Sequence, residues 1–177
     1  MLLDLSNFLS EELDEYSFSG NLESTDSSFE VDDLNLIFPI YYKGKITNLI
    51  SGYELNLQIT YKFKTHCDRC LKEIVAEIQT PYKGYYYKDK SLYDEDSVED
   101  YFQIQEQAIN LDEIIISLVI MSKPYKVLCK EDCKGLCPIC GTNINENTCE
   151  CSKKITEQSI DPRFAKLKDL FKNEEVW

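Results

Sequence analysis

Eight cysteines, arranged as four closely spaced pairs, constrain this chain of 177 residues more than any other feature. The pairs account for every cysteine: Cys67-x-x-Cys70, Cys129-x-x-x-Cys133, Cys137-x-x-Cys140 and Cys149-x-Cys151. Tetrahedral zinc takes four thiolates at about 2.3 Å, and a tight turn between two cysteines lets both sulfurs reach one ion. The spacing therefore predicts one or two structural zinc ions held only by cysteine.

The run CPICG, from Cys137 to Gly141, is the strongest single signal. Its proline restricts the backbone inside the turn, and its glycine permits a tight conformation after the second cysteine. The compact segment from Cys137 to Cys151 can close one site alone, which leaves Cys67, Cys70, Cys129 and Cys133 for the other.

A competing grouping joins the pairs Cys67/Cys70 and Cys137/Cys140 into an ordinary zinc ribbon, and the sequence does not choose between the two. A four-thiolate zinc carries a formal charge of about −2, which nearby basic side chains can offset. The candidates for that role are Arg69, Lys72, Lys130, Lys134, Lys153 and Lys154.

Other uses of these cysteines are less favoured. Thiolate knuckles also bind iron, as in rubredoxin, and reactive cysteines form disulfides, but no C-x-x-C here opens a helix after a strand. A catalytic zinc keeps an open position and usually has mixed ligands. His66, the only histidine, could replace one cysteine, although a role beside the site or in solvent is favoured.

The compartment follows from what the sequence lacks. The N-terminus, MLLDL, has no basic region or cleavage pattern of a secretory signal. The apolar stretch from Ile114 to Met121 is far shorter than the ~18 residues of a membrane span. We expect a cytoplasmic protein, where thiols stay reduced and closely spaced cysteines favour metal over disulfides.

The formal net charge of −13 is unevenly spread. Residues 1–42 contain ten Asp or Glu and no Lys or Arg, and residues 91–122 contain eight acids and no base. Such an acidic chain does not bind nucleic acid by diffuse attraction, which depends on Lys and Arg. The acidic runs form either solvated surface, the favoured interpretation, or a face for a basic partner.

Alternating apolar residues predict a mainly antiparallel β region. Residues 53–64 have a clean period of two and residues 74–79 a weaker one, so both are predicted strands of a hairpin. The hairpin tip carries Cys67 and Cys70. A third alternation over residues 34–42 contains Pro39, which predicts a strand at a sheet edge.

Two helices are predicted nearer the C-terminus. Asn110 and Glu113 suit a helix start, and the helix ends near Pro124, although the run Ile114-Ile115-Ile116 also suits a buried strand. Asp161 and Pro162 begin a terminal helix. The predicted fold class is α+β, with a mainly β domain with one helix over residues 1–123. Residues 124–177 form a cysteine-rich zinc-binding segment and a C-terminal helix.

Nothing in the sequence supports an enzyme. With one histidine, any Ser-His-Asp arrangement would be coincidental, and the six glycines form no phosphate-binding loop. The aromatic run Tyr85-Tyr86-Tyr87 stands beside Lys83 and Lys88 and could stack on RNA bases, but strand packing is the favoured interpretation.

With these motifs the chain resembles the YceD family, the large ribosomal RNA subunit accumulation proteins. The resemblance rests on the motifs CDRCL (67–71), CKGLCPICGTNIN (133–145), CEC (149–151) and DPRFAxL (161–167). It implies a role in synthesis, processing or accumulation of large-subunit ribosomal RNA, beside that RNA or a ribosomal protein, with no established enzymatic activity. Arg69 and Arg163 are candidate contact residues for RNA or a protein partner. The alternatives are an iron electron carrier and a structural zinc module of another complex.

Overall fold

The alternating segment predicted over residues 53–64 lies within the strand β4 (Gly52–His66) of the computed structural model. It pairs antiparallel with β5 (Glu73–Tyr87) along its whole length, from Gly52 opposite Tyr87 to His66 opposite Glu73. The predicted hairpin is therefore confirmed. Its second strand is longer than the pattern of residues 74–79 indicated, because it continues past Pro81, where β5 pairs with β4 alone.

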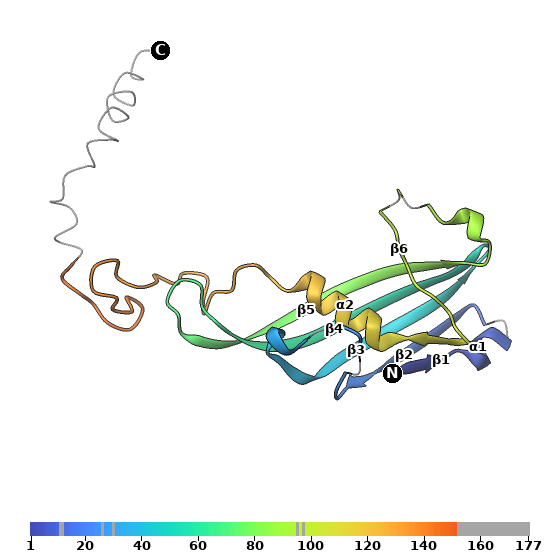
Figure 1. The fold of residues 1–177 in the computed structure, drawn as a ribbon, viewed down its shortest axis with the longest axis horizontal. Helices are drawn as coiled ribbons and strands as arrows, with labels where there is room; N and C mark the ends of the chain where they lie inside the picture. Colours follow the sequence, from blue (N-terminus) through green and yellow to red (C-terminus); the bar gives the residue numbers. More distant parts are fainter. Residues whose placement is uncertain (11–12, 26, 30, 95, 97, 152–177) are drawn as a thin grey trace, which may run out of the picture. The chain divides into compact units, whose positions relative to one another are not determined.

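The structure describes residues 1–10, 13–25, 27–29, 31–94, 96 and 98–151. Within them a five-stranded sheet has the order β2-β3-β4-β5-β6, and a separate pair joins β1 to β7 (Figure 1). The remaining strands are β1 (Leu2–Asp4), β2 (Glu15–Leu22), β3 (Leu36–Leu49), β6 (Asp100–Tyr101) and β7 (Ala108–Asn110). All pairings are antiparallel except that of β5 with β6.

The edge position predicted for the strand around Pro39 is wrong. β3 lies inside the sheet, between β2 and β4. Proline is tolerated there because the register between β3 and β4 shifts between Ile37 and Tyr41, and the pairing with β2 stops at Ile40. Pro39 thus occupies a bulge where neither neighbouring strand requires its missing N–H.

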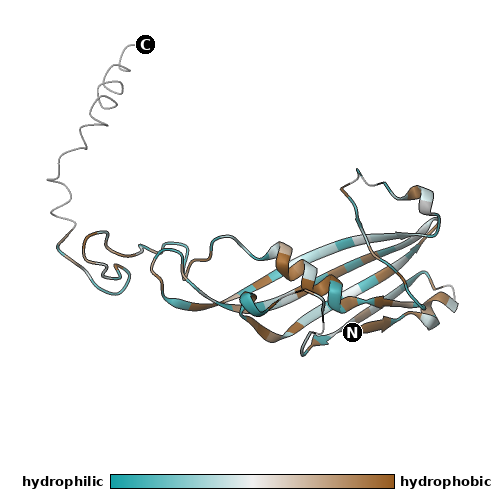
Figure 2. Cartoon of the chain, viewed as in Figure 1, coloured by the Kyte–Doolittle hydropathy of each residue, from teal (hydrophilic) through white to brown (hydrophobic). Residues whose placement is uncertain are grey.

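The predicted helix near residue 110 is confirmed as α2 (Leu111–Ser122), which lies across one face of the sheet (Figure 1). Leu111, Ile115 and Val119 are buried and recur every four residues, so they form one apolar stripe along a helix. The isoleucine run 114–116, which also suited a strand, is therefore helical. Apolar and polar residues are interleaved along the strands beneath it (Figure 2). Short helices α1 (Ser6–Ser10), η1 (Asp32–Leu34) and η2 (Lys90–Leu92) complete the described elements.

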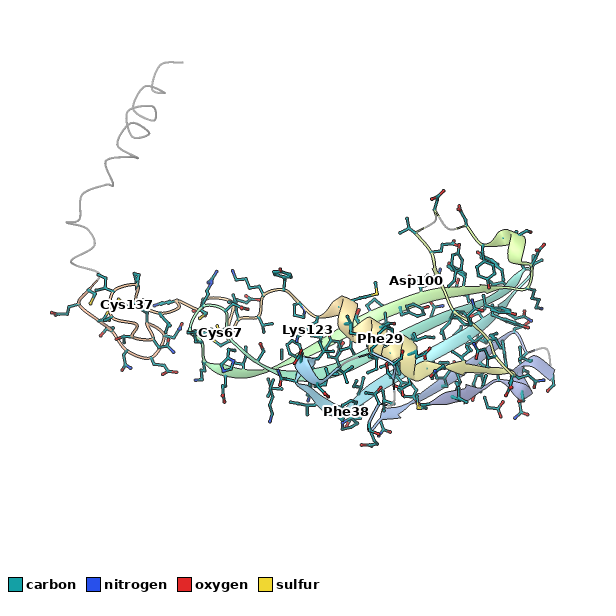
Figure 3. All side chains as sticks on the ribbon, viewed as in Figure 1. Phe29, Phe38, Cys67, Asp100, Lys123 and Cys137 are labelled. Atoms are coloured by element: carbon teal, nitrogen blue, oxygen red, sulfur yellow. The ribbon has the colours of Figure 1, made fainter. Side chains whose placement is uncertain are left out.

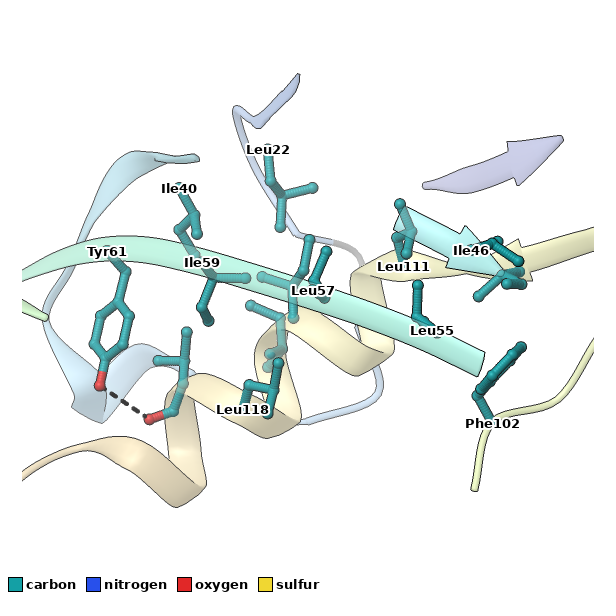
Figure 4. Packing of buried hydrophobic residues seen from close by; sticks show 14 of the residues in the cluster. Leu22, Ile40, Ile46, Leu55, Leu57, Ile59, Tyr61, Phe102, Leu111 and Leu118 are labelled. Carbon is teal, nitrogen blue, oxygen red and sulfur yellow. Dashed lines mark hydrogen bonds between the residues drawn. The ribbon is translucent and has the colours of Figure 1, made fainter. Parts of the chain in front are cut away.

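The core lies between α2 and the sheet (Figure 4). Leu55, Ile59 and Tyr61 of β4 are fully buried. The hydroxyl of Tyr61 donates to the carbonyl oxygen of Val119 at 3.5 Å and lies 3.1 Å from the hydroxyl of Ser122. Burial raises the pKa of Tyr61. These contacts satisfy the buried Tyr61 hydroxyl and hold the end of α2 against β4.

The start of α2 differs from the predicted cap. Asn110 occupies the N-cap position but its side chain makes no capping hydrogen bond, since its backbone belongs to the β1–β7 pair. Asp112 is only 5% exposed and accepts a hydrogen bond from the Thr25 hydroxyl at 2.7 Å. At least this acid of the 91–122 run is therefore internal and not solvated surface.

The tyrosine run at the end of β5 divides between the two faces of the sheet. Tyr86 packs against the core and stacks on Tyr53 with ring centroids 6.0 Å apart. Tyr85 and Tyr87 lie parallel on the opposite face, and Tyr87 also contacts Tyr93. The favoured interpretation, strand packing, therefore holds for Tyr86.

The chain forms two compact units. One contains Met1–Cys67 and Glu73–Val127, which includes both sheets and α2, and the other contains Asp68–Lys72 together with the described residues 128–151. The predicted α+β class, mainly antiparallel with cysteine clusters near the C-terminus, is confirmed. The predicted helix beginning at Asp161 lies outside the described residues. Among those described, no helix is long and apolar enough to cross a membrane.

Candidate metal centre

The first cysteine cluster, here called tetrad 1, contains Cys67, Cys70, Cys129 and Cys133, and their sulfurs all lie within 4.8 Å of one another. Cys67 directly follows β4, and Cys70 lies in the same six-residue loop, residues 67–72, before β5. Cys129 and Cys133 follow α2 in the chain. Cys67, Cys70 and Cys133 are buried, and the Cys70 and Cys129 sulfurs are 3.6 Å apart.

The second cluster, tetrad 2, contains Cys137, Cys140, Cys149 and Cys151, also with all sulfurs within 4.8 Å. Cys137 is buried, whereas Cys140 is exposed. Figure 3 labels one cysteine of each tetrad, Cys67 and Cys137. The structure thus has the first of the two groupings that the sequence left open, and not the zinc-ribbon grouping.

Both tetrads suit a tetrahedral thiophilic ion. Four sulfurs at about 2.3 Å from zinc lie about 3.8 Å from one another, a spacing that small side-chain movements within either tetrad would produce. The donor set is thiolate alone and takes up all four positions of a tetrahedron. The two tetrads could each hold a metal ion.

Each C-x-x-C turn is followed by a residue in the left-handed conformation, which closes the turn. Gly141 after Cys140 has φ of 72°, and its N–H donates to the carbonyl oxygen of Cys137 at 2.9 Å. Leu71 occupies the equivalent position after Cys70 and has φ of 58°, which is strained for a residue with a side chain. The same backbone shape therefore forms in both turns, although only one has the glycine.

Gly135 brings two segments of the second unit close together. Its φ is 76°, and a methyl group at this position would lie 3.0 Å from the carbonyl oxygen of Arg69. Only glycine meets both requirements without strain. The motif CKGLC, between Cys133 and Cys137, thereby lets the backbone beside tetrad 1 approach the loop that carries Cys70.

Basic side chains lie beside tetrad 1, as predicted. Arg69 donates from Nη1 to the carbonyl oxygen of Cys133 at 2.8 Å. The Glu146 carboxylate, 3.2 Å from the Lys72 ammonium, raises the pKa of Lys72, and negative charge on the sulfurs of Cys129 and Cys70 raises it further. Lys72 is thus placed to offset negative charge on these sulfurs.

Asn145 is a structural residue that the sequence argument missed. Its Nδ2 donates to the Cys133 sulfur at 3.4 Å, and its Oδ1 accepts from the N–H of Lys134 at 2.8 Å. Its own N–H and Nδ2 also donate to Oδ1 of Asn143. The signal was present in the sequence TNINEN, because closely spaced asparagines are typical of turns that hydrogen-bond their own backbone.

The thiols of tetrad 2 differ in acidity. Cys140 Sγ lies 3.2 Å from the Thr142 hydroxyl, and hydrogen bonds from the side chain and backbone of Thr142 lower the pKa of Cys140 to about 6. A hydrogen bond to Cys140, with some burial, raises the pKa of Cys151 to about 11. Cys140 is therefore the first thiol to lose its proton, and neighbouring thiols of the tetrad donate hydrogen bonds to its sulfur. This suits a cluster whose thiols release their protons when a cation binds.

Other predicted residues take different positions. His66 belongs to neither tetrad; it is exposed, with Nε2 3.7 Å from Oε1 of Glu73. Lys130 pairs with Asp132 at 3.7 Å. Arg163, Lys153 and Lys154 lie outside the described residues.

Comparison with known proteins places these motifs in a family. The family model described as "Large ribosomal RNA subunit accumulation protein YceD" matches residues 55–171, a span that contains all eight cysteines. No solved structure matches the chain.

Similar curated proteins occur in mycobacteria, and all are uncharacterised. Proteins of Mycobacterium bovis and Mycobacterium tuberculosis are each 30% identical over 105 residues, which cover 59% of this chain and 48% of theirs. A protein of Mycobacterium leprae is 28% identical over 116 residues, or 63% of this chain and 50% of its own. The chain spans about half the length of these relatives. Since the family model covers more than half of the chain, this protein belongs to the YceD family of large ribosomal RNA subunit accumulation proteins.

Proposed function

We propose that this protein is a non-enzymatic, cytoplasmic factor that promotes synthesis, processing or accumulation of large-subunit ribosomal RNA, and that two structural zinc ions hold its cysteine-rich segment folded. The observation that carries the proposal is that all eight cysteines form two closed tetrads within the span matched by the family. The family name supplies the link to ribosomal RNA, and the tetrads supply the link to metal.

Zinc is the ion that we assign to both tetrads, with Cys67, Cys70, Cys129 and Cys133 as ligands of one, and Cys137, Cys140, Cys149 and Cys151 as ligands of the other. Structural zinc sites are closed, with four protein ligands, whereas catalytic sites keep a position for water. Four thiolates leave no such position, which supports a structural role and no enzymatic activity.

Metal would then decide the state of the C-terminal segment. Structural zinc contributes on the order of 10 kcal/mol or more of apparent binding free energy to small folds. We propose that residues 1–123 form a domain that folds around its own core, and that residues 124–177 form a domain that depends on zinc. The large apolar cluster lies almost wholly within the first of these ranges.

The partner is large-subunit ribosomal RNA, a ribosomal protein, or both. Arg69 and Arg163 remain candidate contacts, and the acidic segments 1–42 and 91–122 suit a basic ribosomal protein. The bond from Arg69 to Cys133 supports a structural role for that guanidinium. A contact role for Arg69 must therefore appear as lost partner binding with the zinc sites intact.

Depletion of the protein from growing cells tests this proposal. We expect the ratio of large-subunit to small-subunit ribosomal RNA to fall, and the wild-type gene to restore it. An unchanged ratio and unchanged ribosome profiles would favour a structural module of some other complex. Iron in place of zinc in the purified, coloured protein would favour the iron electron carrier, which the CPICG knuckle also suits.

A further inference from the structure

One face of the five-stranded sheet is polar and, among the described residues, largely exposed. Here "the outer face" means the side of β2 to β5 opposite α2, which carries Tyr41 and the lysines Lys43, Lys45, Lys62, Lys64 and Lys83. Side chains alternate between the faces of a sheet, and the register places these residues on the face opposite the buried side chains of β4. None of them is buried, and Tyr41 is 56% exposed.

The charge of the outer face differs from that of the whole chain. Among the described residues three of its four glutamates pair with a lysine: Glu15 with Lys45, Glu54 with Lys83 and Glu77 with Lys62. The fourth, Glu73, lies 3.7 Å from His66, which is charged only when protonated. In a protein with a net charge of −13, this face is the exception: its five lysines outnumber its four glutamates, and Lys43 and Lys64 are the lysines that no ion pair engages in the described part of the chain.

The outer face also has hollows and hydrogen-bonding side chains that suit an extended chain. Two shallow hollows, of about 560 and 190 Å³, both include Lys43 and Gln58, so they adjoin across β3 and β4. Asn56, Gln58 and Thr60 offer donors and acceptors along β4, and Tyr41 offers an exposed ring. Lys43 faces Gln58, and Lys64 lies six residues further along β4, about 20 Å away at 3.4 Å per residue.

We propose that the outer face binds a single-stranded segment of RNA, with Lys43 and Lys64 on its phosphates, Tyr41 stacked on a base, and the amides of β4 near base edges. Sheets with aromatic and basic side chains bind single strands in this way. The exposed pairs such as Lys62 with Glu77 are weak and can exchange their partner for phosphate. The choice of RNA over other polyanions rests on the proposed function.

The test measures the affinity of the zinc-loaded 177-residue chain for a fluorescent, mixed-sequence RNA of about 16 nucleotides, by anisotropy at several salt concentrations. The double variant Lys43→Gln/Lys64→Gln is compared with the control Lys88→Gln/Lys126→Gln, in which Lys88 lies over the core-facing ring of Tyr53. The control lowers the charge equally at two exposed lysines off the outer face.

Each phosphate contact on a single strand contributes about 0.7 to the slope of log K against log salt. We expect the outer-face variant to lose about 1.4 from that slope, which corresponds to about twentyfold weaker binding at 0.1 M salt. The control should match the wild type. Equal losses in both variants, or none in either, would overturn the proposal, as would a wild-type protein that binds an acidic peptide but no RNA.

The same variants in depleted cells separate this inference from the proposed function. If depletion lowers large-subunit RNA and the outer-face variant restores it as well as the wild type does, the outer face is not the RNA site and the proposed function stands. If depletion leaves that RNA unchanged, the proposed function fails, and the anisotropy alone decides whether the outer face binds RNA.

Discussion

Arg69 donates a hydrogen bond from Nη1 to the carbonyl oxygen of Cys133, 2.8 Å away, and so joins the two sequence segments that supply tetrad 1. The residues are far apart in the chain, and each lies next to or on a cysteine of the tetrad. The carbonyl of Arg69 is in turn the group that Gly135 approaches most closely. Arg69 is thus placed to hold the tetrad closed through its side chain, while its backbone lies where only a glycine fits at position 135.

Replacing Arg69 by alanine should loosen tetrad 1. A hydrogen bond from a charged group contributes about 1.5–3 kcal/mol, and the exposure of this guanidinium reduces that to about 1 kcal/mol. We expect a chelator to remove zinc from tetrad 1 about fivefold faster in Arg69→Ala. Stopped-flow absorbance with a coloured chelator measures the rate.

The control for this substitution is Lys130→Ala, which removes an exposed cation next to Cys129 whose ion pair, in the part of the chain that the structure describes, is with Asp132. It should leave the rate unchanged. If Arg69→Ala weakens RNA binding while zinc release stays at the wild-type rate, Arg69 is a contact residue and its structural role is refuted.

The two left-handed glycines provide a matched pair. Alanine at either position costs about 1–2 kcal/mol for the backbone conformation. At Gly141 a methyl group would meet no atom within 4 Å, whereas at Gly135 it would lie 3.0 Å from the Arg69 carbonyl oxygen. We expect Gly135→Ala to lower the zinc affinity of tetrad 1 more than Gly141→Ala lowers that of tetrad 2. Competitive zinc titration compares them, and equal losses would contradict the close approach.

Alkylation of the metal-free protein tests the acidity of tetrad 2. The pKa of Cys140 is lowered to about 6, so its sulfur is protonated below that pH and a reactive thiolate above it. The pKa of Cys151 is raised to about 11, which keeps it a thiol at neutral pH. Iodoacetamide at pH 7 should label Cys140 before Cys151, and its rate at Cys140 should fall as the pH drops through about 6. Peptide mass spectrometry follows both, and preferential labelling of Cys151 would reverse the assignment.

In the core, the Tyr61 hydroxyl connects β4 to the end of α2. Tyr61→Phe should lower the free energy of unfolding by about 1 kcal/mol, because one net hydrogen bond is lost while Ser122 keeps its bond to Leu118. Urea denaturation followed by near-ultraviolet circular dichroism measures the change. Tyr41→Phe, on the exposed outer face, should change stability by less than about 0.5 kcal/mol. A similar loss in both variants would exclude a specific role for the buried hydroxyl.

Local sequence patterns predicted an element correctly where burial of one face determines its structure. The alternation in β4 and the helical stripe from Leu111 to Val119 each record burial on a single face, so both elements were predictable. The cysteine spacing likewise indicated two four-cysteine sites. The grouping was not predictable, because both arrangements satisfy the same local turns and only the long-range placement of Cys129 and Cys133 separates them.

The two wrong predictions have a common cause: contacts between distant segments cannot be inferred from the local sequence. Pro39 suggested an edge strand, but a bulge placed it where no hydrogen bond was needed. Asp112 looked like a solvated helix-start acid, yet Thr25, 87 residues away in sequence, supplies its hydrogen bond inside the protein. In each case the partner that decided the outcome came from a distant segment.

Metal stoichiometry tests the two-tetrad account most directly. The wild-type protein should contain two zinc ions. Cys67→Ser/Cys129→Ser removes two ligands from tetrad 1 alone, so it should keep one ion, whereas Cys129→Ser/Cys149→Ser damages both tetrads and should keep none. Mass spectrometry under native conditions counts the bound ions. The opposite result, none in the first variant and one in the second, would mean that Cys67/Cys70 share an ion with Cys137/Cys140 and would contradict the account.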